Sequence, residues 1–228
     1  QAIPAQSALV PNTFGYNPGY KSENSEYSLA KAKALLDMYG YVDCDGDGWR
    51  DLPRANGNGE CRPFTIEYAS APSASQKPLD ENWKKNMDAI GINLAFRKAK
   101  WPDLLKESKA GKLQMWGLGW SAAIPDADAF FVMLYGPNGG QANHSRFDRP
   151  EFNRLYEEAK RLPDGPERTR LYGRMARIIA AYAPWDLGVY NYENTLVRPW
   201  VRGYVKHVSW EHPWKYHDLD IEARRRAK

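Results

Sequence analysis

The stretch from FTIEYA (64–69) to LQMWGLGW (113–120) decides the fold class of this chain. FTIEYA and INLAFRKA (92–99) alternate apolar and polar residues, as half-buried strands do, and LQMWGLGW has the apolar character of a third strand. Two helical segments, NWKKNMDAIG (82–91) and WPDLLKESKAGK (101–112), lie between them. This alternation predicts an α/β fold, with a small mixed sheet that carries helices on both faces.

Helical patterns continue on both sides of this stretch. Ser28 is placed to cap a helix through LAKAKALLDMY (29–39), where apolar residues recur on one face and Gly40 ends the pattern. PEFNRLYEEAKRL (150–162) predicts a further helix, and PERTRLYGRMARIIAAYA (166–183) predicts a longer one with its arginines off the apolar stripe. The apolar stripe of this last helix is expected to lie in the core.

The two ends of the chain differ from its centre. Residues 1–24 are rich in Pro, Gly, Asn and Ser without periodicity, so we expect an extended lead-in or linker. Residues 25–185 carry the helix and strand patterns and are predicted to form one α/β lobe. Residues 186–228 are expected to close the structure with two strands, DLGVYN (186–191) and NTLVR (194–198), followed by an irregular tail.

Composition narrows the class of protein. The 228 residues are 43% hydrophobic and 26% charged, which is typical of a globular chain with a substantial core. The net charge of +4 is spread along the chain, apart from a terminal run EARRRAK (222–228), so a nucleic-acid partner is not expected. No apolar run approaches the roughly 18 residues that a membrane-spanning helix needs.

The two cysteines bracket a loop rich in Gly, Asp and Asn. Cys44 and Cys61 are close enough in sequence to form a disulfide, which persists only in oxidising compartments. The alternative is a pair of reduced, buried thiols. We favour the disulfide and, with it, a location outside the cytoplasm.

The same loop resembles the first part of a calcium-binding EF-hand loop. Asp43, Asp45 and Asp47 occupy alternate positions and Asp51 the ninth, but the twelfth position, where a bidentate Glu is needed, is Arg54. Asp and Gly also favour turns without any metal, so a structural turn is the preferred interpretation and weak calcium binding is the alternative.

Motifs for catalysis are weak. His207, His212 and His217 recur every five residues, which is not a usual zinc spacing. Asp126 and Asp128 could in principle act as a carboxylate pair, although their position after a proline better suits the start of a helix. We therefore expect no enzyme, no metal and no cofactor, with a hydrolase that uses Asp126 and Asp128 as the alternative.

The end of the strand LQMWGLGW is the best candidate for binding. Ligands of α/β proteins bind at strand ends, and Trp120 there would offer an aromatic face beside the backbone groups of Ser121 and its neighbours. The competing interpretation is that Trp116 and Trp120 are core aromatics that pack on the sheet.

At this segment the sequence resembles the C-terminal part of the family 5 extracellular solute-binding proteins, the dipeptide- and oligopeptide-binding receptors of bacterial ABC importers. The resemblance covers nearly the whole chain. It is carried by ordered blocks, SLAKAKALLDMYGY (28–41), DGDGWRD (45–51), WPDLLKESKAGKLQMWGLGW (101–120), PEFNRLYEEA (150–159), PERTRLYGRMARIIAAYAPW (166–185) and LVRPWVRGY (196–204).

The resemblance implies a fold and a length. Complete members of the family are more than twice as long and form two lobes around a closing cleft, in the manner of type II periplasmic binding proteins. This chain is similar to the C-terminal lobe and to the last segment, which returns to the first lobe. We therefore expect a fragment whose residues 186–228 return toward a missing first lobe.

The resemblance also implies site residues. In peptide-binding members the strand that ends in Gly-Trp contacts the ligand, which points to Trp120 and Ser121. An Asp three residues after that Trp pairs with the free amine of a peptide, but here the position is Ala123, and Asp126 is the nearby carboxylate that could replace it. A cleft-facing tyrosine of the family falls near Tyr190 and Tyr192.

The function implied is capture of a peptide-like or other small polar solute in the cleft between the lobes. The receptor would deliver the solute to the permease subunits of an ABC importer in the inner membrane. The implied location is the periplasm, with secretion or the cell envelope as the alternatives. Besides the hydrolase, an extracytoplasmic sensor domain is the alternative from another class.

Overall fold

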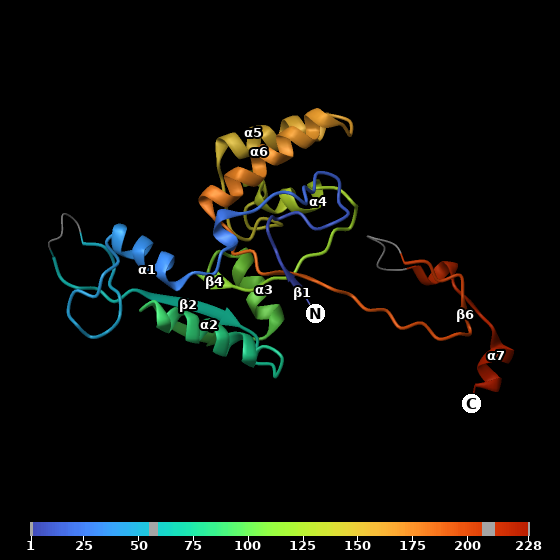
Figure 1. Ribbon diagram of the computed structural model, residues 1–228, viewed down its shortest axis with the longest axis horizontal. Helices are drawn as coiled ribbons and strands as arrows, with labels where there is room; N and C mark the ends of the chain where they lie inside the picture. Colours follow the sequence, from blue (N-terminus) through green and yellow to red (C-terminus); the bar gives the residue numbers. More distant parts are fainter. Residues whose placement is uncertain (1, 55–58, 207–212, 228) are drawn as a thin grey trace. The chain divides into compact units, whose positions relative to one another are not determined.

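Helices and short strands follow one another along the computed structural model, which describes residues 2–54, 59–206 and 213–227 (Figure 1). The α-helices are α1 (Leu29–Met38), α2 (Lys77–Ala89), α3 (Trp101–Lys109), α4 (Asp128–Phe131), α5 (Pro150–Arg161), α6 (Pro166–Tyr182) and α7 (Ile221–Arg226). The strands are β1 (Ala2–Pro4), β2 (Thr65–Ser70), β3 (Asn93–Lys98), β4 (Met115–Trp116), β5 (Val189–Asn191), β6 (Val201–Arg202) and β7 (Asp218–Leu219). Within the described residues, no helix is long and apolar enough to span a bilayer.

The chain divides into two compact units. Unit 1 combines residues 1–25 with residues 120–228, and unit 2 consists of residues 26–119. Residues 120–185, which the sequence pattern assigns to one lobe with residues 25–119, thus group with the N-terminal segment. The predicted division into a lead-in, one lobe and a tail that returns to a first lobe refers to a complete two-lobed protein. It therefore stays a prediction.

Unit 2 is built on the sheet that the sequence predicts. β2 lies between β3 and β4, and both pairings are parallel, with Tyr68 opposite Phe96 on one side and Met115 on the other. The α/β class is therefore confirmed. β4 is only two residues long, whereas the apolar pattern predicted a strand over 113–120. The residue after β4 is Gly117, and a Cβ added there would lie 2.9 Å from the Tyr68 hydroxyl. The close approach of Tyr68 thus requires a glycine at this position.

Two polar contacts hold the elements of unit 2 together. Arg50 donates through Nε to the Ile90 carbonyl (2.7 Å) and through Nη1 to Asp37 (2.6 Å), so it ties the ends of α1 and α2 to the loop between them. The buried Asp80 of α2 forms an ion pair with Lys98 of β3. Helix α1 begins as predicted, because the Ser28 hydroxyl accepts the Lys31 N–H at 3.2 Å.

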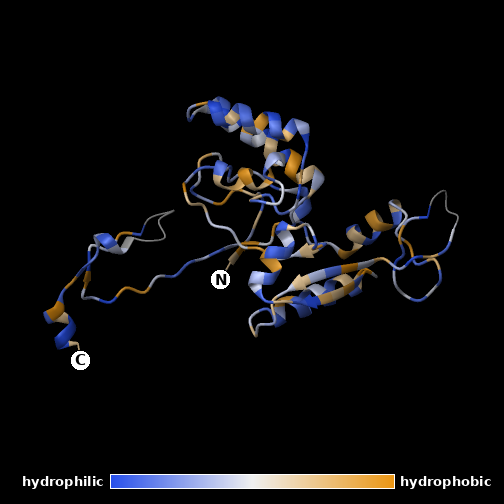
Figure 2. Cartoon of the chain, turned by 180° about the vertical axis from the view of Figure 1, so that it is seen from behind, coloured by the Kyte–Doolittle hydropathy of each residue, from blue (hydrophilic) through white to orange (hydrophobic). Residues whose placement is uncertain are grey.

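The core of unit 1 lies around α5 and α6, which run side by side (Figure 1). Hydrophobic and hydrophilic residues alternate along these helices, as Figure 2 shows, and Leu155, Leu171 and Met175 are almost completely buried. The predicted core position of the α6 stripe is confirmed at Leu171, Met175 and Ile179, but it is wrong for the last residue of the stripe, Tyr182, which is 55% exposed. The lead-in also contributes to this core, because Ala8 and Leu9 are buried against it.

The N-terminal strand of unit 1 forms a short antiparallel pair with a strand that follows α6. β1 pairs with β5, with Ile3 opposite Tyr190. The second strand predicted in this region, at 194–198, is not formed, and Leu196 there is 97% exposed. A strand needs a neighbour to accept its hydrogen bonds, and residues 201–202 and 218–219 pair with each other instead.

Candidate functional site

Trp120 is the first residue of unit 1 after the sheet and is held in place by one hydrogen bond. Its indole Nε1–H donates to the Ala129 carbonyl of α4 at 3.0 Å. The side chain nevertheless remains 48% exposed, and Ser121 and Ala123 after it are also exposed. Trp120 thus offers an oriented aromatic face to solvent, which differs from the core role considered for it.

The loop that carries these residues is fixed by the lead-in. The Phe14 N–H donates to the Pro125 carbonyl at 2.8 Å, and the Ala127 N–H donates back to the Phe14 carbonyl at 3.0 Å. These two bonds form a short parallel bridge between residues 14 and 126. The segment from Trp120 to Ala123, in which only Ala122 is partly buried, therefore precedes a stretch of backbone that is bonded to the lead-in.

Asp126 uses both of its carboxylate oxygens within the protein. Arg168 donates through Nη1 to Oδ2 at 2.7 Å and through Nη2 to Oδ1 at 3.2 Å. The Tyr172 hydroxyl and the Asp128 N–H also donate to Oδ1, at 2.9 and 2.8 Å. The side chains of Asp126 and Arg168 are only 15% and 13% exposed. This carboxylate is a structural anchor of the loop.

The neighbouring tyrosines have perturbed acidities that follow from this packing. Burial, together with the hydrogen bond to Asp126, raises the pKa of Tyr172 well above its usual value. Burial and a hydrogen bond to Asp128 raise the pKa of Tyr156 in the same way. Both carboxylates of the pair considered for acid–base chemistry thus accept hydrogen bonds from protonated phenols.

The two tyrosines of the β5 region have different roles. Tyr190 directs its hydroxyl inward, where it accepts the Ser7 N–H at 3.1 Å and lies 2.8 Å from the carbonyl oxygens of both Ser7 and Leu9. Tyr192, just beyond the end of β5, is 58% exposed. Of the two, Tyr192 is the one whose ring is available to a ligand.

The structure brings only some of the predicted site residues together. Trp120 and Asp126 share one loop, but within the described residues Trp120 makes no ring contact with Tyr190 or Tyr192. The sequence pattern did not predict Arg168 as the partner of Asp126. Its expected place off the apolar stripe of the helix is wrong, because Arg168 lies one helical turn before Tyr172 and shares the face of α6 that turns toward the core.

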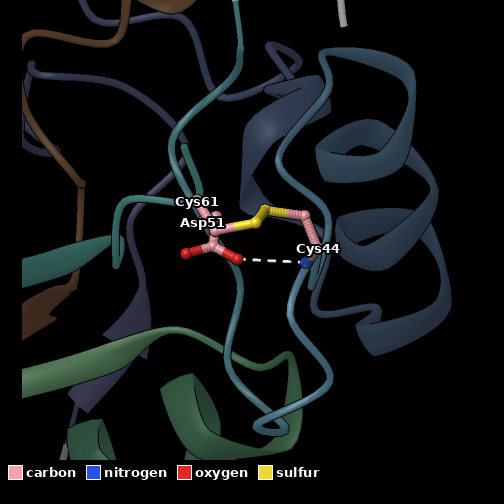
Figure 3. Close-up of side chains that lie close together, drawn as sticks. All are labelled: Cys44, Asp51 and Cys61. Atoms are coloured by element: carbon pink, nitrogen blue, oxygen red, sulfur yellow. Dashed lines mark hydrogen bonds between the residues drawn. A yellow bond between two sulfur atoms is a disulfide. The ribbon is translucent and has the colours of Figure 1, made fainter. Parts of the chain in front are cut away.

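The predicted disulfide is confirmed. Cys44 and Cys61 are joined, with their Cα atoms 6.0 Å apart, and the buried Asp51 accepts the Cys44 N–H at 3.0 Å beside the bond (Figure 3). The bond and the carboxylate together fix the start of the loop that follows α1.

The aspartates of this loop make the hydrogen bonds of a turn. Asp43 accepts the N–H groups of Gly46 (2.7 Å) and Gly48 (2.9 Å), and these bonds lower the pKa of its carboxyl group. Carboxylate oxygens of Asp43, Asp45 and Asp51 lie within 4.8 Å of one another. The preferred turn interpretation accounts for the Asp43 contacts, and weak calcium binding stays an untested alternative.

The histidine series is described only in part. His207 and His212 lie outside the described residues. The His217 ring lies 5.5 Å from the Tyr204 ring, measured between centroids, so it packs within the tail.

Comparisons with known proteins identify relatives of the chain. Residues 1–142 match the model of the bacterial extracellular solute-binding proteins, family 5. Heme-binding protein A of Haemophilus influenzae is 29% identical over 89% of this chain and 34% of its own length. Di/tripeptide-binding protein 4 of Pseudomonas aeruginosa is 32% identical over 90% of this chain and 36% of its own length. The chain thus spans about a third of the length of these relatives.

Solved structures share the fold. The oligopeptide-binding protein AppA of Bacillus subtilis, solved in complex with a nonapeptide, superposes with a TM-score of 0.78 at 18% identity, and the match covers 96% of this chain and 43% of that one. At this level of identity the similarity concerns the fold alone. It agrees with the α/β architecture described above.

Proposed function

Because the chain belongs to the bacterial extracellular solute-binding proteins of family 5, we propose that it forms part of the solute receptor of an ABC importer. In this function it supplies one wall of the binding cleft, and the remainder of a longer protein supplies the other. Closure of two walls around a solute is the mechanism by which such receptors retain it. The partners are the solute and the permease subunits in the inner membrane, and the location is the periplasm.

The observation that carries the proposal is the state of Trp120. Its ring is almost half exposed while its indole N–H is bound to Ala129. An exposed tryptophan whose orientation is already fixed loses little freedom when a ligand stacks on it. In our proposal Trp120 and Ser121 contact the solute directly, and Tyr192 adds a second aromatic surface.

Asp126 and Tyr190 have positioning roles in this proposal. Asp126 anchors the loop through Arg168 and Tyr172, and Tyr190 fixes the lead-in through Ser7 and Leu9. A carboxylate that is already paired with a guanidinium provides little attraction for the ammonium group of a ligand. The same pairing argues against a hydrolase that uses Asp126 as a general acid or base, and the relatives are named as binding proteins.

The solute class follows from what the segment offers. Ala123 provides no charge, and Asp126 is occupied, so the segment favours solutes with flat apolar surfaces and backbone-like hydrogen-bonding groups over those recognised by a free amine. Peptide-like solutes with a blocked or neutral end fit this description. The two relatives described above are named for heme and for di- and tripeptides, so membership of the family does not by itself choose the solute.

The test is a binding measurement on the full-length gene product. We expect a panel of free-amine and N-acetylated peptides, together with hemin, to include a ligand that quenches tryptophan fluorescence in a saturable manner. Trp120→Ala should lower that affinity about tenfold or more, as expected for a buried aromatic contact. Trp101→Ala, which removes an equally exposed tryptophan from α3, is the matched control and should leave the affinity within about twofold of wild type. Equal effects of both variants would exclude Trp120 from the site.

A further inference from the structure

A small pocket in unit 1 lies apart from the Trp120 segment. It has a volume of about 150 Å³ and lies between the last turns of α6 and the segment of the lead-in up to Ser25, with Trp185 and Asp186 at its edge. A cavity of this volume accommodates a molecule of about six non-hydrogen atoms, the size of benzene. None of the residues proposed to contact the solute lines it.

The charge that the lining of the pocket carries is negative. Asp186 is the only charged side chain among the described residues that line it. Within the described part of the chain Asp186 has no ion-pair or hydrogen-bond partner. The residue is exposed at the mouth of the pocket, and partial burial of its carboxyl group raises the pKa of that group above its ordinary value.

Three of the polar side chains that line the pocket donate to backbone carbonyl groups. Asn24 donates through Nδ2 to the Ala180 carbonyl at 2.6 Å, and Ser25 donates through Oγ to the Ala5 carbonyl at 3.0 Å. Ser7 donates through Oγ to the Leu9 carbonyl at 3.1 Å. These three donors thus point to backbone carbonyls, while the Asp186 oxygens stay available as acceptors.

Two further features favour a positive ligand. The pocket lies at the C-terminal end of α6, a helix of 17 residues, where the carbonyl groups and the helix dipole present negative potential. Trp185 beside it packs partly against the core and offers an aromatic wall, and aromatic faces attract organic cations. Ile179 and Leu187 provide apolar surface for an alkyl chain.

We propose that this pocket binds a small organic cation, an alkylammonium ion whose charged end pairs with Asp186 and whose chain lies along Trp185 and the end of α6. The site is distinct from the proposed solute site, since the two share no residue. Its occupation would join the lead-in to α6.

The proposal is tested on the 228-residue chain with n-butylammonium chloride as the probe and n-butanol as the neutral control of similar shape, at constant ionic strength. Titrations followed by two-dimensional NMR should show saturable shifts at the Trp185 indole and at Ala180 for the cation. The alcohol should bind at least about fivefold more weakly, because a hydrogen bond to a charged group is roughly twice as strong as a neutral one.

Two variants separate charge from shape. Asp186→Asn keeps the size of the side chain and should weaken butylammonium binding at least about fivefold, whereas Ala180→Leu fills the pocket and should abolish the shifts. Asp103→Asn, which removes an exposed carboxylate from α3 in unit 2, is the charge-matched control and should bind as wild type does. Equal affinity for butylammonium and butanol, or unchanged affinity in Asp186→Asn, would overturn the proposal, and so would the absence of saturable shifts in wild type.

Discussion

Arg168 of α6 and Asp126 of the loop before α4 form an ion pair of 2.7 Å, with little of either side chain exposed. The arginine also donates through Nε to the Ala159 carbonyl of α5 at 3.1 Å, and its guanidinium lies 5.6 Å from the centroid of the Phe14 ring. One side chain of α6 thus contacts three other segments of unit 1. Asp126 and Arg168 are 42 residues apart in the sequence.

Replacing this arginine is expected to destabilise unit 1 strongly. Arg168→Met leaves the Asp126 carboxylate without its counter-ion in a largely buried place, which costs about 3 kcal/mol. Arg170→Ala is the matched control on the same helix, because its pair with Glu167 is mostly exposed, and it should change stability by less than about 1 kcal/mol. Urea denaturation curves of both variants measure the difference. Similar midpoints for the two would show that the Asp126 pair carries no special weight.

The loop after α1 is expected to depend on its disulfide. The bond closes a loop with a sequence separation of 17 residues, for which chain entropy predicts a stabilisation of about 3 kcal/mol. The double variant Cys44→Ala, Cys61→Ala should therefore melt at a lower temperature than the oxidised wild type in differential scanning calorimetry. Thiol titration of the denatured, unreduced protein should find no free thiol. Two thiols per chain would contradict the disulfide directly.

Asp43 is expected to make stability depend on acid pH. Its carboxyl pKa is lowered from the ordinary value of 3.8 by the backbone N–H groups of Gly46 and Gly48, so the folded state binds this proton less tightly than the unfolded state. The resulting stabilisation is fully present above pH 3.8 and is lost as the pH falls through the lower folded value. Asp43→Asn should therefore reduce stability at about pH 6 more than at about pH 2.

Thermal melts over this pH range measure the effect. Asp45→Asn serves as the control, since it changes the same charge in the same loop but removes a single backbone contact, to Asp47. Its difference from wild type should be smaller at every pH. A stability loss in Asp43→Asn that is independent of pH would mean that the carboxylate charge is not the cause.

Ligand selectivity is expected to respond to a carboxylate at position 123. In the full-length protein, Ala123→Asp should raise the affinity for free-amine peptides by about tenfold to a hundredfold, because a charge-assisted hydrogen bond in a closed cleft contributes roughly 1.5 to 3 kcal/mol. Calorimetric titration with matched free-amine and N-acetylated peptides measures the gain. Asp126→Asn should lower stability and leave the preference between these peptides unchanged. The native protein could instead already prefer free-amine peptides and lose this preference in Asp126→Asn. That result would show that Asp126 binds the amine of the ligand.

The sequence predicts the local elements well because their signals are local. The Ser28 cap, the alternation in 65–70 and 93–98 and the amphipathic pattern of α6 each depend on neighbours within a few residues. The disulfide is predicted for the same reason, since its two cysteines flank one loop. Each of these signals can be evaluated without knowing what the segment packs against.

The remaining features depend on partners that are distant in sequence. The inward hydroxyl of Tyr190 and the occupied carboxylate of Asp126 are determined by the lead-in and by α6, which no local pattern indicates. The strand predicted at 194–198 failed because β-propensity alone does not supply a pairing neighbour. The identity of the solute is even less predictable from local sequence patterns, because it depends on groups that are arranged around a cleft.

The division of the chain into units has a consequence for biosynthesis. Unit 2 is contiguous over residues 26–119, whereas unit 1 needs Leu9 from the lead-in and Leu171 and Met175 from α6 to complete its core. A ribosome that adds about 5 to 20 residues per second needs several seconds to proceed from residue 119 to the end of α6. During that interval the whole sequence of unit 2 has been synthesised, whereas the lead-in still lacks its partners in α6. Until α6 has been synthesised, residues 1–25 therefore lack the partners that bury Ala8 and Leu9.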